Sequence, residues 1–386
     1  MQVKRVVMFF SGRLFPSETG TARVVADMAR LLNAQEGVQL TLVVLDGQMS
    51  AADEELCRSV SWKFVRLRPV SRWSSCGILN AAARRLGADV HAAFFRALAI
   101  RRQMTEICAD ADVVLVNSTV WHPILPQAMR RQKAVVVTHD ILFQRRASFE
   151  GRRRTAGRFL AALRTKLELA VLRSFRRVAV FAEYERDLLE KSGMPSDRIA
   201  CIGLPVVCER QVSARKKDWD FVLIGAGCRQ NEEAAACFFR RVVPLLDGRR
   251  VSLAVAGGLC ESAFWQRRLP ENVNVVRLGF VPNLSEVCAR SRIGVSMPIH
   301  GSGVKVKTVE CIEAGLPMVL TDCGEEGVPT TPDGSVNVDC VSDEDVRAKI
   351  LRWLDDPGFA TEAGLRQSEA VRAAFSPERT LKGLLS

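Results

Sequence analysis

Residues 301–328 read GSGVKVKTVECIEAGLPMVLTDCGEEGV, and this stretch decides the fold of the second half of the chain. Glycines and two lysines precede a short helical pattern that carries Glu310, and an Ala-Gly-Leu-Pro break ends that pattern. A buried strand is then predicted at 318–321, followed by a second glycine-rich turn. A loop, a helix and a buried strand in this order indicate a parallel α/β architecture.

The loop that opens this stretch is suited to binding phosphate. Glycines let backbone N–H groups approach a ligand closely, and a helix N-terminus carries about half a positive charge. Lys305 and Lys307 add full charges at the same place, and Glu310, about one turn along, has the oxygens to accept hydrogen bonds from sugar hydroxyls. Diphosphate bound by glycines and lysines, with ribose bound by a carboxylate, predicts a nucleotide-sugar site.

The same residues resemble the donor-site signature of the retaining glycosyltransferases of family 4 (glycosyl transferases group 1), which have the two-domain GT-B fold. The family helix commonly reads K-x-x-E-A-x-A-x-G-x-P-V-V-x-T, and the residues of this chain in that frame are Lys307, Glu310, Ala314, Gly315, Pro317, Met318, Val319 and Thr321. Many members have a second glutamate eight positions before Glu310, where this chain has Ser302. The match is closer to the subgroup that reads G-x-G-x-x-x-K-x-x-E. We expect the serine at this position to affect how the donor sugar's hydroxyls are bound, and not whether the nucleotide binds.

The resemblance implies a set of donor-binding residues in the second half. In relatives an Arg and a Lys usually bind the diphosphate from the loop after this domain's first strand, but Ala226 and Gln230 occupy those places here. We expect Arg229, beside them, to substitute together with the two lysines, because a guanidinium matches phosphate oxygens and an ammonium acts as a point charge. The predicted donor-binding residues are Gly301, Gly303, Val304, Lys305, Val306, Lys307, Glu310, Arg229 and His300.

His139 is the predicted catalytic residue. It ends a strand within VTHDIL, and many relatives have a histidine here that lies close to the sugar's reactive carbon. We expect it to orient the donor or to help deprotonate the acceptor, since an unperturbed histidine titrates near neutral pH. The alternative is a strand-end histidine that bonds only to backbone. His122 follows another predicted strand and would face the cleft if that strand forms, whereas His91 is expected to be structural.

Gly20 is the predicted acceptor and phosphate loop residue of the first half. It precedes a strongly periodic helix, at a place where the family often has paired glycines near the donor phosphate and the acceptor. A plain helix-entry turn is the alternative interpretation. Arg13 and Glu18 flank this loop and are expected to meet the acceptor.

Short β-branched runs alternate with helical patterns along the whole chain, which is typical of parallel α/β sheets. We predict strands at 5–10, 40–45, 63–67, 113–117, 134–138 and 178–181, then at 221–224, 252–256, 273–277, 293–296 and 318–321. The predicted fold class is α/β, with two Rossmann-like doubly wound domains facing across a cleft (GT-B). We expect residues 1–206 to form the domain that binds the acceptor and residues 207–375 to form the domain that binds the nucleotide sugar. Residues 204–218 are predicted to be the linker, and a closing helix at 376–386 is expected to return to the first domain.

Composition places the chain among globular proteins. It has 386 residues with 48% hydrophobic and 25% charged residues, enough for two domains. No run of about 20 apolar residues occurs, and the opening KRVVMFF is too short for a secretory signal. The twelve cysteines form no C-x-x-C pair, which favours reduced cysteines in the cytoplasm. We expect a cytoplasmic protein, peripheral on the inner face of the cell membrane.

Positive charge is concentrated in the first half. Residues 1–208 contain 32 Lys and Arg against 19 Asp and Glu, whereas the remainder contains 23 against 24. The arginines from Arg145 to Arg158 exceed what a core could pair, so we expect them to contact an anionic membrane. Nucleic acid is not expected as a partner, because no aromatic stacking motif accompanies the arginines. The apolar stripe that follows them (Phe159, Leu163, Leu167, Val171 and Phe175) is predicted to pack on the sheet.

The sequence therefore predicts a hexosyltransferase that retains configuration and moves a sugar from a nucleotide diphosphate sugar to a glycan or lipid-linked acceptor, in cell-surface polysaccharide or lipopolysaccharide synthesis. No cofactor and no metal are expected, because no His, Asp and Glu cluster has the spacing of metal ligands. A sugar-nucleotide epimerase of the same fold and a degenerate, non-catalytic sugar-nucleotide-binding relative remain alternatives.

Overall fold

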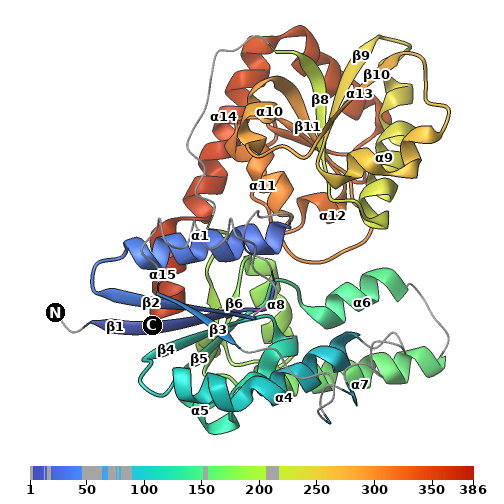
Figure 1. The fold of residues 1–386 in the computed structure, drawn as a ribbon. Coiled ribbons are helices and arrows are strands. Elements are labelled where there is room, and N and C mark those ends of the chain that lie inside the picture. Colours follow the sequence, from blue (N-terminus) through green and yellow to red (C-terminus); the bar gives the residue numbers. More distant parts are fainter. Residues whose placement is uncertain are drawn as a thin grey trace. The chain divides into compact units, whose positions relative to one another are not determined.

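The computed structural model describes residues 3–12, 14, 19–45, 63–67, 75, 78–79, 89–150, 155–205 and 217–386. Its contacts divide the chain into two compact units, Met1–Pro205 with Pro377–Ser386, and Val206–Ser376. We call these the N-terminal unit and the C-terminal unit. Each is built on its own sheet with helices between the strands (Figure 1). Arg13, Glu18 and most of the predicted linker lie outside the described residues.

The sheet of the N-terminal unit has the order β3-β2-β1-β4-β5-β6-β7, and every neighbouring pair is parallel. Because β1 and β4 are neighbours while the chain winds outward on both sides of them, the point where strand order reverses lies between these two strands. The strands are β1 (Lys4–Phe10), β2 (Val38–Leu45), β3 (Lys63–Leu67), β4 (Val113–Asn117), β5 (Ala134–Val137), β6 (Arg177–Val180) and β7 (Ile199–Cys201).

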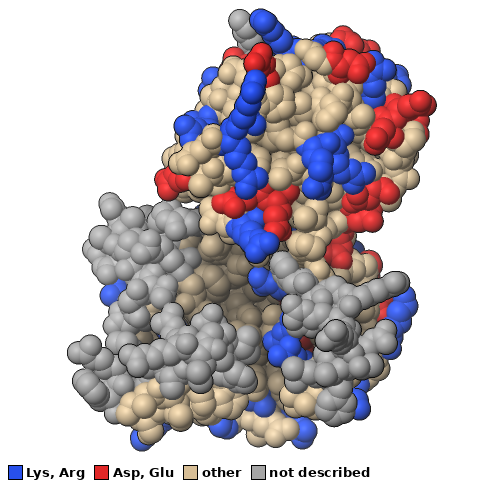
Figure 2. Space-filling model, turned by 90° about the vertical axis from the view of Figure 1, so that its right-hand side faces the viewer, with Lys and Arg blue, Asp and Glu red and all other residues tan. Residues whose placement is uncertain are grey.

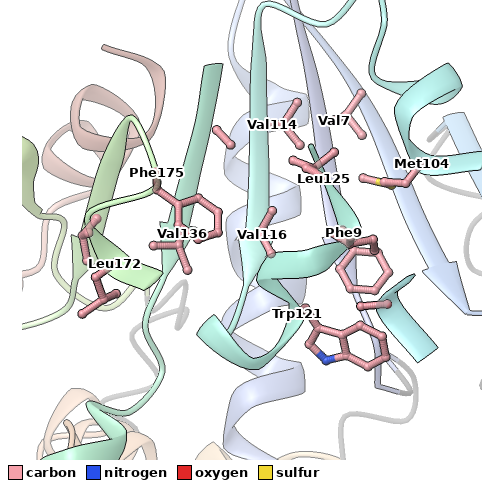
Figure 3. Close-up of a cluster of buried hydrophobic side chains, with 14 of the residues drawn as sticks. Val7, Phe9, Met104, Val114, Val116, Trp121, Leu125, Val136, Leu172 and Phe175 are labelled. Atoms are coloured by element: carbon pink, nitrogen blue, oxygen red, sulfur yellow. The ribbon is translucent and has the colours of Figure 1, made fainter. Parts of the chain in front are cut away.

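Helices surround this sheet and bury its apolar faces. They are α1 (Gly20–Ala34), α4 (Asp89–Ile107), η1 (Thr119–Ile124), α5 (Gln127–Lys133), α6 (Leu142–Glu150), α7 (Thr155–Leu172), α8 (Glu183–Lys191), η2 (Ser196–Arg198) and α15 (Pro377–Leu385). Figure 3 shows part of the core, where the ring of Trp121 lies against Phe9 with centroids 5.2 Å apart. Leu172 and Phe175 enter the same core near β5 and β6.

The prediction that the apolar stripe of α7 packs on this sheet is wrong for two of its residues. Leu163 is 43% exposed and Leu167 is 59% exposed, so this side of α7 faces outward. The buried side of α7 contains Glu168, Leu169 and Leu172 instead. The carboxylate of Glu168 accepts a hydrogen bond at 2.8 Å from the backbone N–H of Leu142, which begins α6, so a polar contact accompanies the buried leucines on this side.

The sheet of the C-terminal unit has the order β10-β9-β8-β11-β12-β13 and is also parallel throughout. Its reversal point lies between β8 and β11. The strands are β8 (Trp219–Ile224), β9 (Val251–Ala256), β10 (Val273–Gly279), β11 (Ser291–Ser296), β12 (Met318–Leu320) and β13 (Ser335–Asn337). The helices are α9 (Arg229–Arg241), η3 (Val243–Leu246), η4 (Gly258–Glu261), η5 (Ala263–Gln266), α10 (Leu284–Ala289), α11 (Val306–Glu313), α12 (Asp322–Glu325), α13 (Asp343–Asp355) and α14 (Pro357–Ala374).

The predicted fold class of two doubly wound α/β sheets is confirmed. All eleven predicted strands form, with bounds within two residues of those expected. The two strands that the sequence pattern missed, β7 and β13, have three residues each and lie at sheet edges. Neither contains a run of large apolar residues of the kind that marks β12, which has the same length.

Helix α15 belongs to the N-terminal unit and packs on β7 at the edge of its sheet. The hydroxyl of Thr380 is buried and donates to the carbonyl oxygen of Ile202 at 2.7 Å. Gly383 lies so close that an added Cβ would meet the Ile202 side chain at 2.4 Å. The last ten residues are therefore part of the N-terminal unit's structure.

We predict that Thr380→Val lowers the free energy of unfolding of this unit by about 1–2 kcal/mol, because it leaves the buried Ile202 carbonyl without its donor. Urea denaturation measures the change. Thr361→Val is the matched control, since Thr361 also donates to a backbone oxygen, that of Pro357, but at an exposed position. Equal effects of the two substitutions would show that α15 contributes nothing through this contact.

Candidate functional site

The loop between β11 and α11 is built around two glycines. Gly301 has φ +146° and Gly303 has φ +75°, a region that side-chain-bearing residues rarely adopt. The loop ends at Lys305, the N-cap of α11, which forms no side-chain cap. Both predicted lysines therefore lie at the N-terminus of this helix, where its dipole is positive.

Helix α11 is fixed at both ends by polar contacts. Near its start, the buried hydroxyl of Thr308 donates to the Ser296 hydroxyl at 2.7 Å, at the end of β11. Near its end, the buried carboxylate of Glu313 forms an ion pair at 2.7 Å with Arg372 of α14. Gly315, with φ +80°, then ends the helix. The loop thus precedes a helix that has little freedom to move.

Lys305 is bonded within the loop region. Its Nζ donates to the carbonyl oxygen of Gly303 at 2.6 Å and lies 3.6 Å from the carboxylate of Glu326. The Lys305 and Glu326 side chains are 14% and 23% exposed. The positive charge of Lys305 is therefore partly balanced by a carboxylate that the sequence did not single out.

Lys307 has a different environment. Its Nζ donates at 2.8 Å to Oδ1 of Asn231 in the first turn of α9. Cys228, Cys311 and Cys323 lie close enough to interact electrostatically with this ammonium, as does Lys305. Removal from water lowers the pKa of the Lys307 ammonium to about 8, because burial disfavours its charged form. An amide oxygen bonds this ammonium without neutralising it, so an anion would be a stronger partner.

Asn231 is oriented by the loop after β8. Its Nδ2 donates to the carbonyl oxygen of Ala226 at 2.9 Å, which leaves Oδ1 facing Lys307. A Cβ on Gly225 would lie 2.9 Å from the Asn231 side chain, and a Cβ on Gly257 would lie 2.5 Å from the Gly225 carbonyl oxygen. These glycines let the loops after β8 and β9 approach, and so bring α9 to Lys307.

The other predicted donor residues occupy varied positions. Glu310 is buried in the second turn of α11, at 6% exposure. The side chain of Arg229 is 86% exposed and pairs with Glu233 at 2.8 Å, one turn along α9. His300, Gly301, Val304 and Val306 are half-buried along the loop, and Ser302 and Gly303 are buried.

In the N-terminal unit, His139 follows β5 and is held by a side-chain relay. Its Nε2 lies 2.9 Å from Oδ1 of Asn117 at the end of β4, and Nδ2 of Asn117 donates to the carbonyl oxygen of Phe9 at 2.9 Å. Because the Phe9 contact fixes the amide, Nε2 is the donor and carries the proton. Burial lowers the pKa of His139 to about 4.

A neutral His139 with its proton on Nε2 presents Nδ1 as a hydrogen-bond acceptor. A group with a pKa near 4 binds a proton weakly at neutral pH, unlike an unperturbed histidine, which titrates near neutrality. Orienting a ligand hydroxyl requires only the neutral ring. Of the two roles predicted for this residue, the geometry favours orientation.

The remaining predicted residues of this unit are placed as follows. Gly20 is the first residue of α1, whose N-cap Thr19 accepts a hydrogen bond from the backbone N–H of Ala22. His122 lies in η1, where its Nδ1 is 3.1 Å from the carbonyl oxygen of Thr119 and burial lowers its pKa to about 4. The side chain of His91 lies outside the described residues.

Two family profiles match the chain. Residues 19–210 match Glycosyltransferase Family 4, and residues 219–356 match Glycosyl transferases group 1. The chain belongs to the group 1 glycosyltransferases. No curated protein sequence matches it.

Solved structures share the fold of this group 1 glycosyltransferase at low identity. Sucrose-phosphate synthase from Thermosynechococcus elongatus has a TM-score of 0.65 and 15% identity, over 98% of this chain and 97% of that one. A mutant TarM of S. aureus, in complex with fondaparinux, α-GlcNAc-glycerol and UDP, has 0.67 and 11%, over 99% of both chains. Anabaena HepE with UDP and glucose has 0.62 and 11%, over 99% and 98%.

In this glycosyltransferase the structure brings Lys305, Lys307 and the two loop glycines together at one helix N-terminus, with Glu310 on the same helix. It directs Arg229 toward Glu233 instead. Sequence reasoning missed Asn231, Glu326 and Asn117, although Asn231 follows a Gly-x-Gly loop that could have drawn attention to it. Among the described residues, no group of three or more His, Cys, Asp and Glu side chains could hold a metal ion.

We predict that the affinity for a nucleoside diphosphate, if this loop binds one, is highest below pH 8 and falls as pH rises through about 8. The reason is that a bound diphosphate favours the charged Lys307, so binding above this pH requires proton uptake, with a loss of up to about tenfold per pH unit. Calorimetry in buffers of different ionisation enthalpy measures both the affinity and the number of protons taken up on binding. Lys307→Gln should abolish the proton uptake near pH 8, and an unchanged uptake in this variant would contradict the assignment.

We further predict that His139 stays neutral from pH 5.5 to 8, with its proton on Nε2, because its pKa is about 4. Nitrogen-15 NMR of histidine-labelled protein, with His139→Gln to assign the signal, reports the protonation state directly. Asn117→Ala should change the tautomer populations by removing the acceptor of the Nε2 proton. A His139 resonance that titrates near pH 6.5 would refute this description.

Proposed function

We propose that this glycosyltransferase is a retaining hexosyltransferase that uses a nucleotide diphosphate sugar and acts on a glycan or lipid-linked acceptor. The observation that carries the proposal is the pair of lysines at the N-terminus of α11. Lys307 there is a half-buried cation bonded to an amide, and Lys305 is nearby at the end of the loop. A diphosphate supplies the negative charge that such a site lacks.

Stabilisation of the leaving group is the largest catalytic contribution in this proposal. The diphosphate gains negative charge as the bond to the sugar breaks, and preorganised cations lower the energy of that state. Lys307 is held ready by Asn231, so little reorganisation is needed when the charge develops. Glu310, in the second turn of α11, would bind the ribose, and the loop backbone around Gly301 and Gly303 the diphosphate.

Similar proteins support a nucleotide sugar as the donor class. The TarM structure contains UDP and α-GlcNAc-glycerol, and the HepE structure contains UDP and glucose. Sucrose-phosphate synthase is named for the synthesis of a sugar phosphate. These proteins are only 11–15% identical to this chain, so they support the class of donor rather than a particular sugar or base.

The N-terminal unit would receive the acceptor. In this proposal the neutral ring of His139 orients the reacting groups. The acceptor or the donor phosphate would approach α1 at Gly20. Retention of configuration is carried over from the family resemblance, which implies no protein nucleophile. We assign no metal ion and no cofactor to the reaction, since the lysines would provide the positive charge.

The proposed pathway is the synthesis of cell-surface polysaccharide or lipopolysaccharide, at the cytoplasmic face of the membrane. Within the described residues no helix is long and apolar enough to cross a membrane. Of the arginines expected to contact anionic lipid, the side chains of Arg152 to Arg158 lie outside the described residues. Arg145 forms an ion pair at 2.9 Å with Asp140, so it contributes less free charge than expected.

Ser302 and the exposed position of Arg229 favour one alternative, a degenerate relative that binds sugar nucleotide without turnover. A sugar-nucleotide epimerase is the other. Nucleotide release from a panel of UDP- and GDP-sugars, with and without membrane extract, distinguishes them. Turnover that depends on the acceptor supports transfer, an isomerised sugar without acceptor supports the epimerase, and binding without turnover supports the degenerate relative.

The site itself is tested by Lys305→Gln with Lys307→Gln. We predict that UDP or GDP affinity falls roughly a hundredfold, because two charge-assisted contacts to the diphosphate are lost. Lys349→Gln in α13, whose Nζ donates to a backbone oxygen, is the control and should leave affinity unchanged. If the double variant folds, as judged by circular dichroism, and still binds either nucleotide like the original protein, the proposed site is wrong.

A further inference from the structure

The outward side of α7 presents apolar side chains to solvent. Leu163 and Leu167 are 43% and 59% exposed and lie four residues apart, so they share one side of the helix. Ala170 is exposed one turn further along. On the opposite side, Leu169 and Leu172 already belong to the core of the N-terminal unit. The core therefore does not account for the leucines at 163 and 167.

The same side of α7 is cationic. Lys166 is exposed between the two leucines, and Arg164 is half-buried beside them. The one acidic residue of α7, Glu168, is buried and accepts a hydrogen bond from α6. We call the set of Leu163, Arg164, Lys166, Leu167 and Ala170 the α7 face. Within residues 161–172 it has no exposed carboxylate.

The half of the chain that contains the α7 face also has an excess of positive charge. The first 208 residues carry an excess of 13 positive charges, whereas the remainder is close to neutral. Figure 2 shows one side of the molecule, where the charged side chains visible on the described part of the N-terminal unit are mostly Lys and Arg. An occupant of the α7 face must therefore be both apolar and negatively charged at its surface.

We propose that the α7 face docks on an anionic lipid bilayer, with Leu163 and Leu167 entering the boundary between headgroups and acyl chains. A bilayer of this kind offers negative charge and apolar depth at one surface. The aliphatic part of Lys166 follows the leucines while its ammonium stays among the headgroups. A second copy fits less well, since a symmetric contact would bring like charges together.

This inference deepens the proposed function, because it says where the enzyme would meet a lipid-linked acceptor. The sequence predicts a membrane contact through the charges of the arginine-rich segment. The present proposal differs because it depends on the insertion of apolar side chains of α7. Vesicle binding requires neither donor nor acceptor. Failure of docking and failure of sugar transfer are therefore seen in separate measurements.

Flotation with vesicles tests the proposal. The full chain is expected to bind vesicles of equal phosphatidylcholine and phosphatidylglycerol, to bind phosphatidylcholine alone weakly, and to lose affinity as salt is raised. Leu163→Gln with Leu167→Gln should lower the affinity roughly tenfold, since two partly exposed leucines no longer enter the bilayer. Arg164→Gln with Lys166→Gln should lower it by about as much.

The matched control removes exposed apolar surface from the other unit. Phe280 is 61% exposed and Val341 is 42% exposed, and Phe280→Gln with Val341→Gln should leave vesicle affinity unchanged. Circular dichroism and urea unfolding show whether each variant is folded. As a second measurement, Leu167→Trp should give tryptophan fluorescence that brominated phosphatidylcholine, mixed with phosphatidylglycerol, quenches beyond the level of the original protein.

Three results would overturn the proposal. One is vesicle binding by the folded leucine variant that equals that of the original protein. Another is a tryptophan at 167 that brominated lipid does not quench in bound protein. The third is light scattering that shows the leucine variant changing from dimer to monomer while its vesicle binding is unaltered, which would assign the α7 face to a second copy of the chain.

Discussion

The hydrogen bond from the half-buried ammonium of Lys307 to the amide of Asn231 is the contact on which the C-terminal unit's site depends. Burying a cation costs free energy unless an anion or several dipoles compensate it. Within the described residues Lys307 forms no ion pair, and its lowered pKa records that cost. The fold nevertheless holds the amine at a helix N-terminus, which is the arrangement that a bound diphosphate would complete.

The surrounding structure serves to keep this amine in place. Thr308 and Glu313 fix α11 to β11 and α14, while close glycine contacts let α9 bring Asn231 to it. Lys305 differs, because Glu326 already balances part of its charge. The two lysines are two positions apart at one loop-helix junction and differ in role: the charge of Lys305 is partly balanced within the protein, and that of Lys307 is left to a ligand.

In the N-terminal unit, too, single polar contacts position the nearby side chains. Asn117 joins the ends of β1 and β4 to His139, so a single amide sets the ring's tautomer. Burial keeps that ring neutral, which suits positioning better than proton transfer. On α7 the buried Glu168 and the core residues Leu169 and Leu172 lie on one side of the helix, and Leu163 and Leu167 face outward.

The sequence by itself determined the α/β class, the described strands other than β7 and β13, and the loop with its glycines, lysines and Glu310. These features are local: β-branched runs, glycine positions and charge spacing need no distant partner. Only the tertiary structure decided that Asn231 and Glu326 bond the lysines, that Asn117 holds His139, and which side of α7 is buried. Such contacts join residues far apart in the chain, and pKa values follow from the burial that those contacts create.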